Sequence, residues 1–172
     1  YKSILIVLLV AVQFMSCSSK ETFIQRSRTS FDFDWKFQLG DIENAELDSF
    51  DDSQWRTLDV PHDWSIEGEY NQDNPSGIAG AFLPTGTGWY RKDLTIDKLE
   101  KTDRYFIEFD GVYMNSSVYV NGQLLGNRPY GYISFSYNLT PHLKEGRNVI
   151  AVKADNSKSP SGRWYTGSGI YR

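Results

Sequence analysis

The segment from Ser117 to Gly126 constrains the fold of this chain more than any other. Two short runs that contain apolar residues, Ser117–Val120 and Gln123–Gly126, stand on either side of Asn121-Gly122. Asparagine and glycine tolerate the positive φ angles of a type I′ turn, which joins neighbouring antiparallel strands. The segment therefore predicts a tight β-hairpin.

Strand candidates continue on both sides of this hairpin. Phe31–Phe37 alternates apolar and polar residues with a period of two, which is the pattern of a half-buried strand. Thr57–Val60 is a short candidate that ends at Pro61, since proline cannot donate a hydrogen bond to a neighbouring strand. Further candidates are Trp89–Ile96, Arg104–Asp110, Phe135–Leu139 and Asn148–Ala154, with a capped turn that buries Trp55 expected at Asp51–Trp55 and a single helical turn at Thr140–Leu143.

The number and spacing of these candidates indicate the fold class. They amount to about eight short strands, and the sequence has no long amphipathic helix and no internal repeat. Short strands at this spacing favour packed antiparallel sheets. We therefore predict an all-β fold, an antiparallel β-sandwich of the jelly-roll type.

The segment Ser65–Gly88 departs from this pattern. It is rich in glycine, contains proline-led turns and has no apolar period. Structureless loops longer than about 12–15 residues are uncommon in compact domains and are often functional. We therefore expect a binding or interface loop here.

The composition narrows the classes of partner. The formal net charge is −4 and no basic stripe is visible, which argues against a nucleic-acid partner. The eleven Tyr, ten Phe and five Trp residues suit a pleated β surface. Aromatic rings also stack on the apolar faces of sugars, although packing in the core is the better explanation for most of them.

The usual signatures of a catalytic or metal site are absent from the sequence. The single cysteine, Cys17, excludes an intrachain disulfide and a cluster of thiolate ligands. His62 and His142 lack metal-ligand spacing, and no H-E-x-x-H, Walker A or G-x-S-x-G motif is present. Adjacent carboxylates such as Asp51/Asp52 lie in a polar turn, where solvated side chains are the expected outcome. We expect no catalytic residue, no metal and no cofactor in this chain.

The first 17 residues have the pattern of a targeting signal. Lys2 gives a positive start, and Ile4–Val12 is an apolar run too short to span a bilayer, which takes about 20 residues. The following Phe14-Met15-Ser16-Cys17 resembles a lipobox, in which a small residue precedes a cysteine that is lipidated and becomes the new N-terminus. We expect a signal peptide at 1–17 and lipidation of Cys17. The alternative is an ordinary signal peptide with a chance cysteine.

The polar stretch at 18–30 is expected to be a weakly ordered tether. Several acyl chains on Cys17 would make a stable anchor, since each buried CH₂ contributes about 0.8 kcal/mol. We expect a secreted protein of the cell envelope, lipid-anchored in the outer membrane or facing the periplasm. Because the sequence does not start with Met, we also expect that its true first residue is missing.

Seven segments carry aromatic, acidic and glycine residues in a fixed order: Trp35–Phe37 with Gly40-Asp41, Asp51–Trp55, Val60–Trp64, Gly86–Lys92, Phe109–Val112, Val120–Gly122 and Arg163–Arg172. Any one of them would be weak, but together they cover residues 31–172 and resemble the N-terminal sugar-binding domain of glycoside hydrolase family 2. The resemblance implies a galactose-binding-like jelly roll at 31–172. In the whole enzyme an immunoglobulin-like domain and a (β/α)₈ barrel with both catalytic glutamates would follow, so we expect a truncated product.

The resemblance is greatest to the β-galactosidase branch, through His62-Asp63-Trp64 and Arg163-Trp164-Tyr165. β-Glucuronidases and β-mannosidases share parts of the pattern. In this family a loop of the first domain reaches the active site in the barrel, and Asn156–Trp164 occupies the matching place. Some β-galactosidases hold a sodium ion near here with an acidic residue. Arg163 stands in this region instead, so no metal site is expected.

Four residues are candidates for contact with a sugar. Arg163 could donate a fork of two hydrogen bonds to sugar hydroxyls, with a salt bridge to the following domain as the equal alternative. Trp164 could stack on the face of a sugar ring or pack under Arg163. His62 and Asp63 could act together as a dyad. The preferred interpretation is that Asp63 caps a turn and that His62 hydrogen-bonds the backbone beside Pro61.

Three functions follow from these observations. The leading one is a non-catalytic segment of a retaining exo-glycosidase that releases terminal β-linked galactose or a similar sugar. The others are a stand-alone carbohydrate-binding lipoprotein and a domain that only packs against its neighbours. The expected partners are a β-galactoside or related glycan, the following immunoglobulin-like and barrel domains, and the membrane through the lipid anchor.

Overall fold

The computed structural model describes residues 26–158 and 162–171, and the chain divides into two units, 1–30 and 31–172. In the first unit, residues 26–30 are exposed and belong to no helix or strand. The predicted signal peptide at 1–17, with Cys17, and residues 18–25 of the predicted tether lie outside the described residues. No helix in the described part of the chain is long and apolar enough to cross a membrane.

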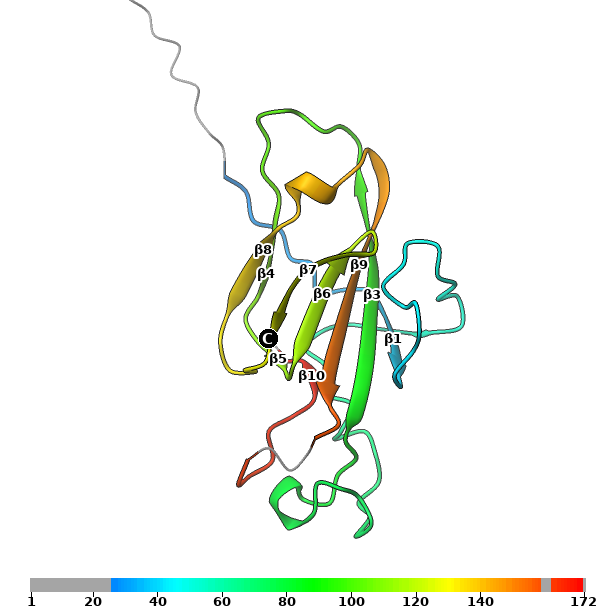
Figure 1. The fold of residues 1–172 in the computed structure, drawn as a ribbon, viewed down its shortest axis with the longest axis vertical. Helices are drawn as coiled ribbons and strands as arrows, with labels where there is room; N and C mark the ends of the chain where they lie inside the picture. Colours follow the sequence, from blue (N-terminus) through cyan, green and yellow to red (C-terminus); the bar gives the residue numbers. More distant parts are fainter. Residues whose placement is uncertain (1–25, 159–161, 172) are drawn as a thin grey trace, which may run out of the picture. The chain divides into compact units, whose positions relative to one another are not determined.

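The described strands of the unit 31–172 form three antiparallel sheets (Figure 1). The largest has six strands in the order β2-β1-β3-β9-β6-β7, and the pairs β4–β8 and β5–β10 form two small sheets. Every pair runs antiparallel, which confirms the predicted all-β antiparallel fold. The strands are β1 (Trp35–Leu39), β2 (Arg56–Leu58), β3 (Gly86–Ile96), β4 (Phe106–Phe109), β5 (Val112–Tyr113), β6 (Ser116–Val120), β7 (Gln123–Arg128), β8 (Phe135–Asn138), β9 (Gly146–Asn156) and β10 (Gly169–Ile170), with 3₁₀ turns η1 (Ile78–Gly80) and η2 (Thr140–His142).

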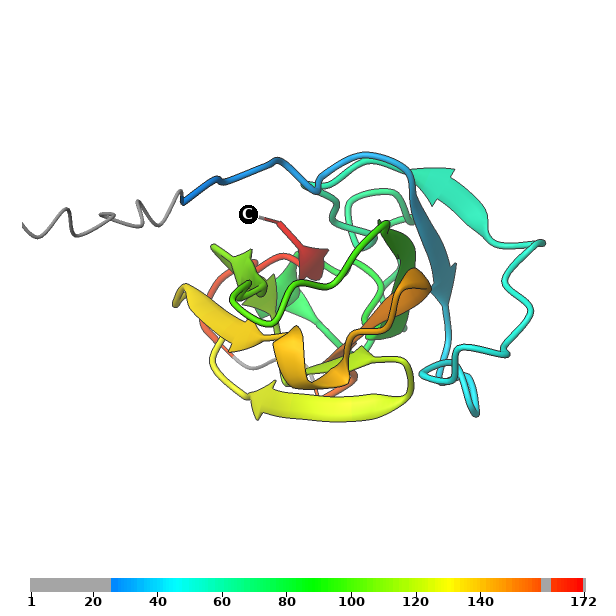
Figure 2. The same cartoon turned by 90° about the horizontal axis from the view of Figure 1, so that it is seen from above.

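The main hydrophobic core lies between the large sheet and the two small ones (Figure 2). Tyr90, Val118 and Ile150 point into it from β3, β6 and β9. Phe109 of β4 and Phe135 of β8 enter from the opposite side, with their rings stacked at a centroid distance of 5.2 Å. Two layers that share one core make this unit a β-sandwich.

The other face of the large sheet is covered by residues 40–55, which connect β1 to β2 and are called the outer loop below. Ala45 and Trp55 of the outer loop pack against Trp89 of β3 and Ala151 of β9. The turn at 51–55 therefore buries Trp55, as predicted. Because β9 is covered on both faces, its alternate side chains supply two separate clusters and its sequence is apolar throughout its centre.

One fully buried arginine holds the outer loop to the sheet. The Nε of Arg91 donates to the Asp52 carboxylate at 2.7 Å, and Nη1 donates to the carbonyl oxygens of Leu47, at 2.9 Å, and of Ala45. Nη2 donates to the carbonyl of Phe50 at 3.4 Å. The centre of the Phe50 ring lies 5.3 Å from the guanidinium carbon. A guanidinium group can serve several acceptors at once, which a shorter or uncharged side chain in β3 could not do.

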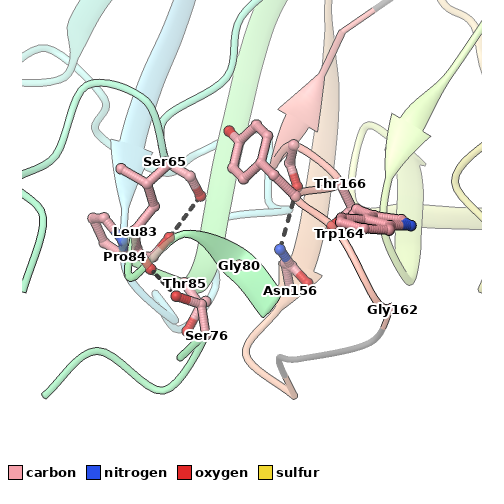
Figure 3. Close-up of a pocket in the computed structure, with 12 residues that line it drawn as sticks. Ser65, Ser76, Gly80, Leu83, Pro84, Thr85, Asn156, Gly162, Trp164 and Thr166 are labelled. Atoms are coloured by element: carbon pink, nitrogen blue, oxygen red, sulfur yellow. Dashed lines mark hydrogen bonds between the residues drawn. The ribbon is translucent and has the colours of Figure 1, made fainter. Parts of the chain in front are cut away.

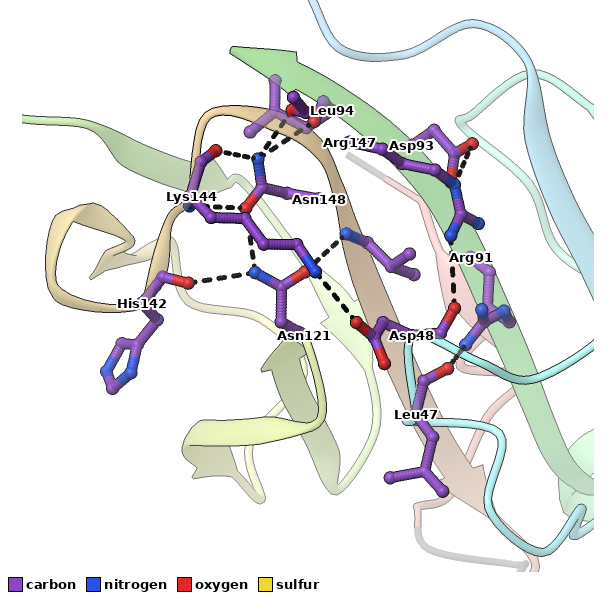
Figure 4. Close-up of polar contacts among 12 residues, drawn as sticks. Leu47, Asp48, Arg91, Asp93, Leu94, Asn121, His142, Lys144, Arg147 and Asn148 are labelled. Carbon is purple, nitrogen blue, oxygen red and sulfur yellow. Dashed lines mark hydrogen bonds and ion pairs between the residues drawn. The ribbon is translucent and has the colours of Figure 1, made fainter. Parts of the chain in front are cut away.

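Further polar contacts join the outer loop and the chain before β9 to the sheet (Figure 4). Lys144 contacts the Asp48 carboxylate at 3.0 Å. Arg147 contacts the Asp93 carboxylate at 2.8 Å and donates to the Asp48 carbonyl at 3.2 Å. These contacts lie at the surface, where an ion pair contributes about 0–1 kcal/mol, so Arg91 is the main polar anchor of the outer loop.

The predicted hairpin is confirmed. Asn121 and Gly122 join β6 to β7 with φ angles of 49° and 80°, both positive as a type I′ turn requires. The Asn121 side chain also accepts from the Val149 N–H at 3.0 Å and donates to the His142 carbonyl at 2.9 Å (Figure 4). The turn is thereby tied to η2, which is the helical turn predicted at Thr140–Leu143.

Several sequence-based boundaries differ from the structure. The strand predicted at Phe31–Phe37 begins only at Trp35, because Asp34 adopts φ 59° and breaks the extended chain. Phe33 consequently points outwards and is 59 % exposed. The loop predicted at Ser65–Gly88 includes the short turn η1 and ends at Gly86, where β3 begins.

Candidate functional site

Two loops meet at one end of the large sheet. The β2–β3 loop comprises residues 59–85, and the β9–β10 loop comprises residues 157–168, of which 159–161 are not described. The His62 N–H donates to the carbonyl of Ile170 at 2.7 Å, and the Trp64 N–H donates to the carbonyl of Ser168 at 3.2 Å. These backbone bonds fix the start of the first loop against the end of the second.

A pocket that is open to solvent lies between the two loops, and the space between its walls is about 270 Å³ when open solvent is included (Figure 3). Its walls come from both loops and from the end of β9, so neither loop forms the pocket alone. Hydroxyl, amide and aromatic groups line it together, a mixture that suits a polar ligand with apolar faces. The lining residues are Ser65, Ser76, Gly80, Leu83, Pro84, Thr85, Asn156, Gly162, Trp164, Tyr165, Thr166 and Gly167.

A chain of hydrogen bonds, buried in large part, links Ser65 and Asn156 of the pocket lining through Ser168. Ser65 Oγ lies 2.6 Å from the Pro84 carbonyl and 2.6 Å from Ser168 Oγ, which lies 2.9 Å from Asn156 Nδ2. A hydroxyl has one proton and a carbonyl can only accept, so Ser65 donates to Pro84 and Ser168 donates to Ser65. Asn156 then donates to Ser168. The order of donors fixes both serine hydroxyls and holds β9 to both loops.

Asp63 joins the two loops a short distance away. Its Oδ1 accepts from the backbone N–H groups of Ser65 and Ser168, each at 3.0 Å, and its Oδ2 accepts from the hydroxyl of Tyr165. Burial and, next, the hydrogen bond to Asp63 raise the pKa of the Tyr165 hydroxyl, which therefore remains a donor. The capping role predicted for Asp63 matches its contact with the Ser65 N–H.

His62 has partners different from those expected. Its ring nitrogens contact the Tyr90 hydroxyl at 2.8 Å, Arg56 at 2.9 Å and the Glu67 carboxylate at 3.2 Å, and not the backbone beside Pro61. Burial lowers the pKa of His62, an effect that its hydrogen bond with Glu67 opposes. Hydrogen bonds from Arg56 and His62 lower the pKa of Glu67 in spite of its partial burial. His62 thus supports the base of the β2–β3 loop and does not line the pocket.

The structure separates the four predicted sugar-contact residues. Trp164 lines the pocket and is 80 % exposed, the highest value among the five tryptophans. Arg163 is exposed beside it and makes no hydrogen bond or ion pair with the described residues. His62 and Asp63 are not among the residues that line the pocket, and they contact the two loops and β3. Contact of all four with a sugar stays a prediction.

Sequence reasoning missed several residues of the pocket. Ser65, Asn156 and Tyr165 come together from positions far apart in the chain, and Tyr165 lies 102 positions from its partner Asp63. One signal was available: the loop expected at Asn156–Trp164 begins with a polar side chain directly after a strand, a common place for functional residues.

No group of three or more His, Cys, Asp or Glu residues that could hold a metal ion occurs among the described residues.

Residues 28–172 match the family model described as glycosyl hydrolases family 2, sugar binding domain. The chain belongs to glycoside hydrolase family 2. The predicted resemblance is confirmed, and the pocket therefore lies in a domain of the family's sugar-binding type.

Relatives with known names agree with this membership. The chain is 55 % identical over 158 residues to the β-galactosidase BoGH2A of Bacteroides ovatus. The matched segment covers 91 % of this chain and 19 % of that enzyme. A solved β-glycosidase from Bacteroides vulgatus is 57 % identical, with a TM-score of 0.80 over 83 % of this chain and 19 % of that one. A solved Bacteroides uniformis β-glucuronidase is 31 % identical, with a TM-score of 0.74 over 86 % of this chain and 17 % of that one. This chain thus spans about a fifth of the length of these relatives.

Proposed function

We propose that this chain supplies the sugar-binding end of a retaining glycosidase that releases terminal β-linked galactose. The 55 % identity to a β-galactosidase over nearly the whole chain carries this proposal. An immunoglobulin-like domain and a catalytic barrel that follow in the same polypeptide would perform the hydrolysis, since this domain spans only a fifth of its relatives. The chain is also similar to β-glucuronidases, so a glucuronide is the alternative substrate and the identity of the sugar is the part of the proposal to test first.

The role of this domain in the proposal is to help enclose the terminal sugar. The exposed indole of Trp164 offers a flat apolar face at the edge of the pocket. Arg163, with no partner among the described residues, presents its fork of donors to hydroxyl groups or to a carboxylate of a following domain. The Thr85 hydroxyl, which also lines the pocket, adds a donor and acceptor of the kind that sugar hydroxyls require, whereas the buried Ser76 hydroxyl already donates to the Leu83 carbonyl at 2.7 Å.

The test is to express the complete reading frame that contains this sequence and to assay paired aryl β-galactoside and aryl β-glucuronide substrates. The proposal predicts hydrolysis of the galactoside with a kcat/KM at least about tenfold above that of the glucuronide, since each 1.4 kcal/mol of transition-state binding gives that factor. Greater activity on the glucuronide would reassign the sugar. No activity on either would remove the catalytic part of the proposal.

A second function is favoured by the exposure of Trp164, which offers an open platform even without other domains. In that case the protein is a stand-alone lipoprotein that captures glycans. It would then bind galactosides with millimolar affinity, because one or two stacked rings make a small contact area. The distinguishing result is binding by this chain together with a reading frame that encodes no catalytic domain.

We further propose export to the cell envelope and lipid anchoring at Cys17, on the strength of the apolar run and lipobox-like sequence at the start of the chain. Mass spectrometry of the protein from the membrane fraction should find an N-terminal acylated cysteine. The variant Cys17→Ala should lose the acyl mass and leave the membrane fraction. An intact residue 1–16 segment on the purified protein would contradict this proposal.

A further inference from the structure

The β9–β10 loop needs anchors from outside itself, because from Gly162 to Ser168 it contains no helix or strand. Asp63 provides two of these anchors, at the Tyr165 hydroxyl and the Ser168 N–H. The Tyr132 hydroxyl also donates to the Thr166 carbonyl, at 3.2 Å. Trp164, which forms a wall of the pocket, directly precedes the tyrosine that Asp63 holds.

The carboxylate of Asp63 is well matched to this task. Its third donor, the Ser65 N–H, belongs to the β2–β3 loop, so one side chain takes donors from both loops that line the pocket. Gly167, with φ 81°, lets the chain approach closely: a Cβ atom there would lie 3.2 Å from Asp63 Oδ2. Hydrogen bonds to an ionised carboxylate are stronger than those between neutral groups.

Asp63 also has little capacity left for a ligand. Both carboxylate oxygens already accept from protein donors, and the residue is not among those that line the pocket. Trp164 and Asn156, in contrast, face the pocket directly. The side chain that the sequence suggested as a sugar contact is therefore arranged to hold the loop that carries other contacts.

We propose that Asp63 is a positioning residue: it holds Tyr165 and Ser168 so that Trp164 stands at the wall of the pocket, and it does not itself touch the sugar. The proposal rests on the proposed function of the pocket as a sugar site. Loss of the anchor should loosen the segment 162–167 and weaken sugar binding, while the β-sandwich stays folded.

The first experiment measures the mobility of the loop in the whole 172-residue chain. The other four tryptophans are buried, so the indole ¹⁵N signal of Trp164 is a specific probe of the pocket wall. Tyr165→Phe removes only the hydroxyl that Asp63 binds, and Asp63→Ala removes the whole anchor. Relaxation should show increasing motion of the Trp164 indole in the order wild type, Tyr165→Phe, Asp63→Ala. The control is Tyr130→Phe, the same chemical change at a tyrosine that is 63 % exposed.

The second experiment titrates the same proteins with methyl β-D-galactopyranoside. Tyr165→Phe should weaken binding about two- to tenfold, the range expected from one net hydrogen bond, with Asp63→Ala weaker still. Asp63→Asn should recover part of the loss, because its amide oxygen can still accept from Ser65 and Ser168. Unfolding in urea provides the stability control for each variant.

The outcomes separate the two proposals. Unchanged motion of Trp164 in Asp63→Ala would overturn the positioning role. Strong loss of binding in Asp63→Asn, with neither extra motion nor loss of binding in Tyr165→Phe, would show that Asp63 contacts the sugar itself and would also overturn it. If the wild-type chain does not bind the galactoside, the titration is repeated with the complete reading frame. Absence of binding there as well would remove the proposed function of the pocket, and the mobility comparison still decides whether Asp63 holds the loop.

Discussion

Arg91 and Asp63 each hold irregular chain to the sandwich through several hydrogen bonds, but they do so in different surroundings. Arg91 is wholly buried in the middle of β3, and its acceptors all belong to the outer loop, 40–55. Asp63 is only partly buried at the end of the sheet, and its donors come from two loops that border a pocket. The first arrangement closes a surface over an apolar cluster, and the second leaves a space between the parts that it joins.

The difference in burial predicts that one charged residue acts mainly on stability and the other mainly on the pocket. A cation without solvent contact must have all its acceptors from the protein, so its removal leaves carbonyl groups and Asp52 without a donor in the interior. An anion at a partly exposed junction can be replaced in part by water. Changes at Arg91 should therefore act mainly on folding, and changes at Asp63 should act mainly on the shape of the pocket.

The largest expected effect comes from Arg91→Met, which keeps the length of the side chain and removes its donors. We expect a loss of about 3 kcal/mol in the free energy of unfolding, because breaking a buried ion pair on one side costs about 3–5 kcal/mol and Asp52 is not wholly buried. Urea unfolding measures it. A loss below about 1 kcal/mol would show that the outer loop does not depend on Arg91.

Gly169→Ala tests the close packing of β10 against Tyr90 and His62, next to Asp63. A Cβ atom at this position would lie 2.2 Å from the Tyr90 hydroxyl oxygen and 2.7 Å from the His62 carbonyl oxygen, and the residue has φ 120°. We expect a loss of about 2–3 kcal/mol from overpacking and backbone strain. Gly146→Ala is the control: it has φ 83° and open space around it, so strain alone should cost about 1–2 kcal/mol. Equal losses in the two variants would contradict the close packing next to Asp63.

Asp63→Ala should cost less stability than Arg91→Met, about 1–2 kcal/mol, since water can reach part of the junction. Its larger consequence is the loosening of the β9–β10 loop. Comparison of the two variants by urea unfolding and by relaxation of the Trp164 indole sharpens the contrast. The contrast fails if Asp63→Ala unfolds as readily as Arg91→Met and leaves the indole unchanged.

A smaller, pH-dependent effect is expected from His62. Burial lowers its pKa below the ordinary value of 6.5, so the unfolded chain takes up a proton at a higher pH than the folded one. The contribution of His62 is therefore fully present above about pH 6.5 and is lost as the pH falls towards the folded-state pKa. Urea midpoints at about pH 7.5 and about pH 5.5 should differ more for wild type than for His62→Gln. Equal differences would assign the pH dependence to other groups.

The smallest effect on stability is expected from Trp164→Ala, within about 0.5 kcal/mol of wild type, because the side chain is 80 % exposed. The same change should abolish measurable galactoside binding if the indole is the platform for the sugar. A stability loss above about 1 kcal/mol would mean that Trp164 packs on the fold more than its exposure indicates.

The sequence predicted those features that neighbouring residues determine. Asn121-Gly122 gave the hairpin because its turn depends on two adjacent φ angles. Phe31–Phe37 was misjudged because its alternation ignores the single left-handed residue Asp34. The family resemblance pointed to the loop that carries Trp164, which lines the pocket, whereas the partners of His62 depend on Tyr90, 28 positions away. Contacts between distant segments, which build the pocket, have no local signal in one sequence.

The measurement that tests the account most directly is a titration of the 172-residue chain with methyl β-D-galactopyranoside, followed by the indole ¹⁵N–H signals of its five tryptophans. The account predicts a saturable shift of the Trp164 signal at millimolar sugar, with Trp35, Trp55 and Trp89 unchanged in their buried positions. A shift confined to other tryptophans, or no shift of Trp164 at about 50 mM sugar in this chain and in the complete protein, would contradict a sugar site at this pocket.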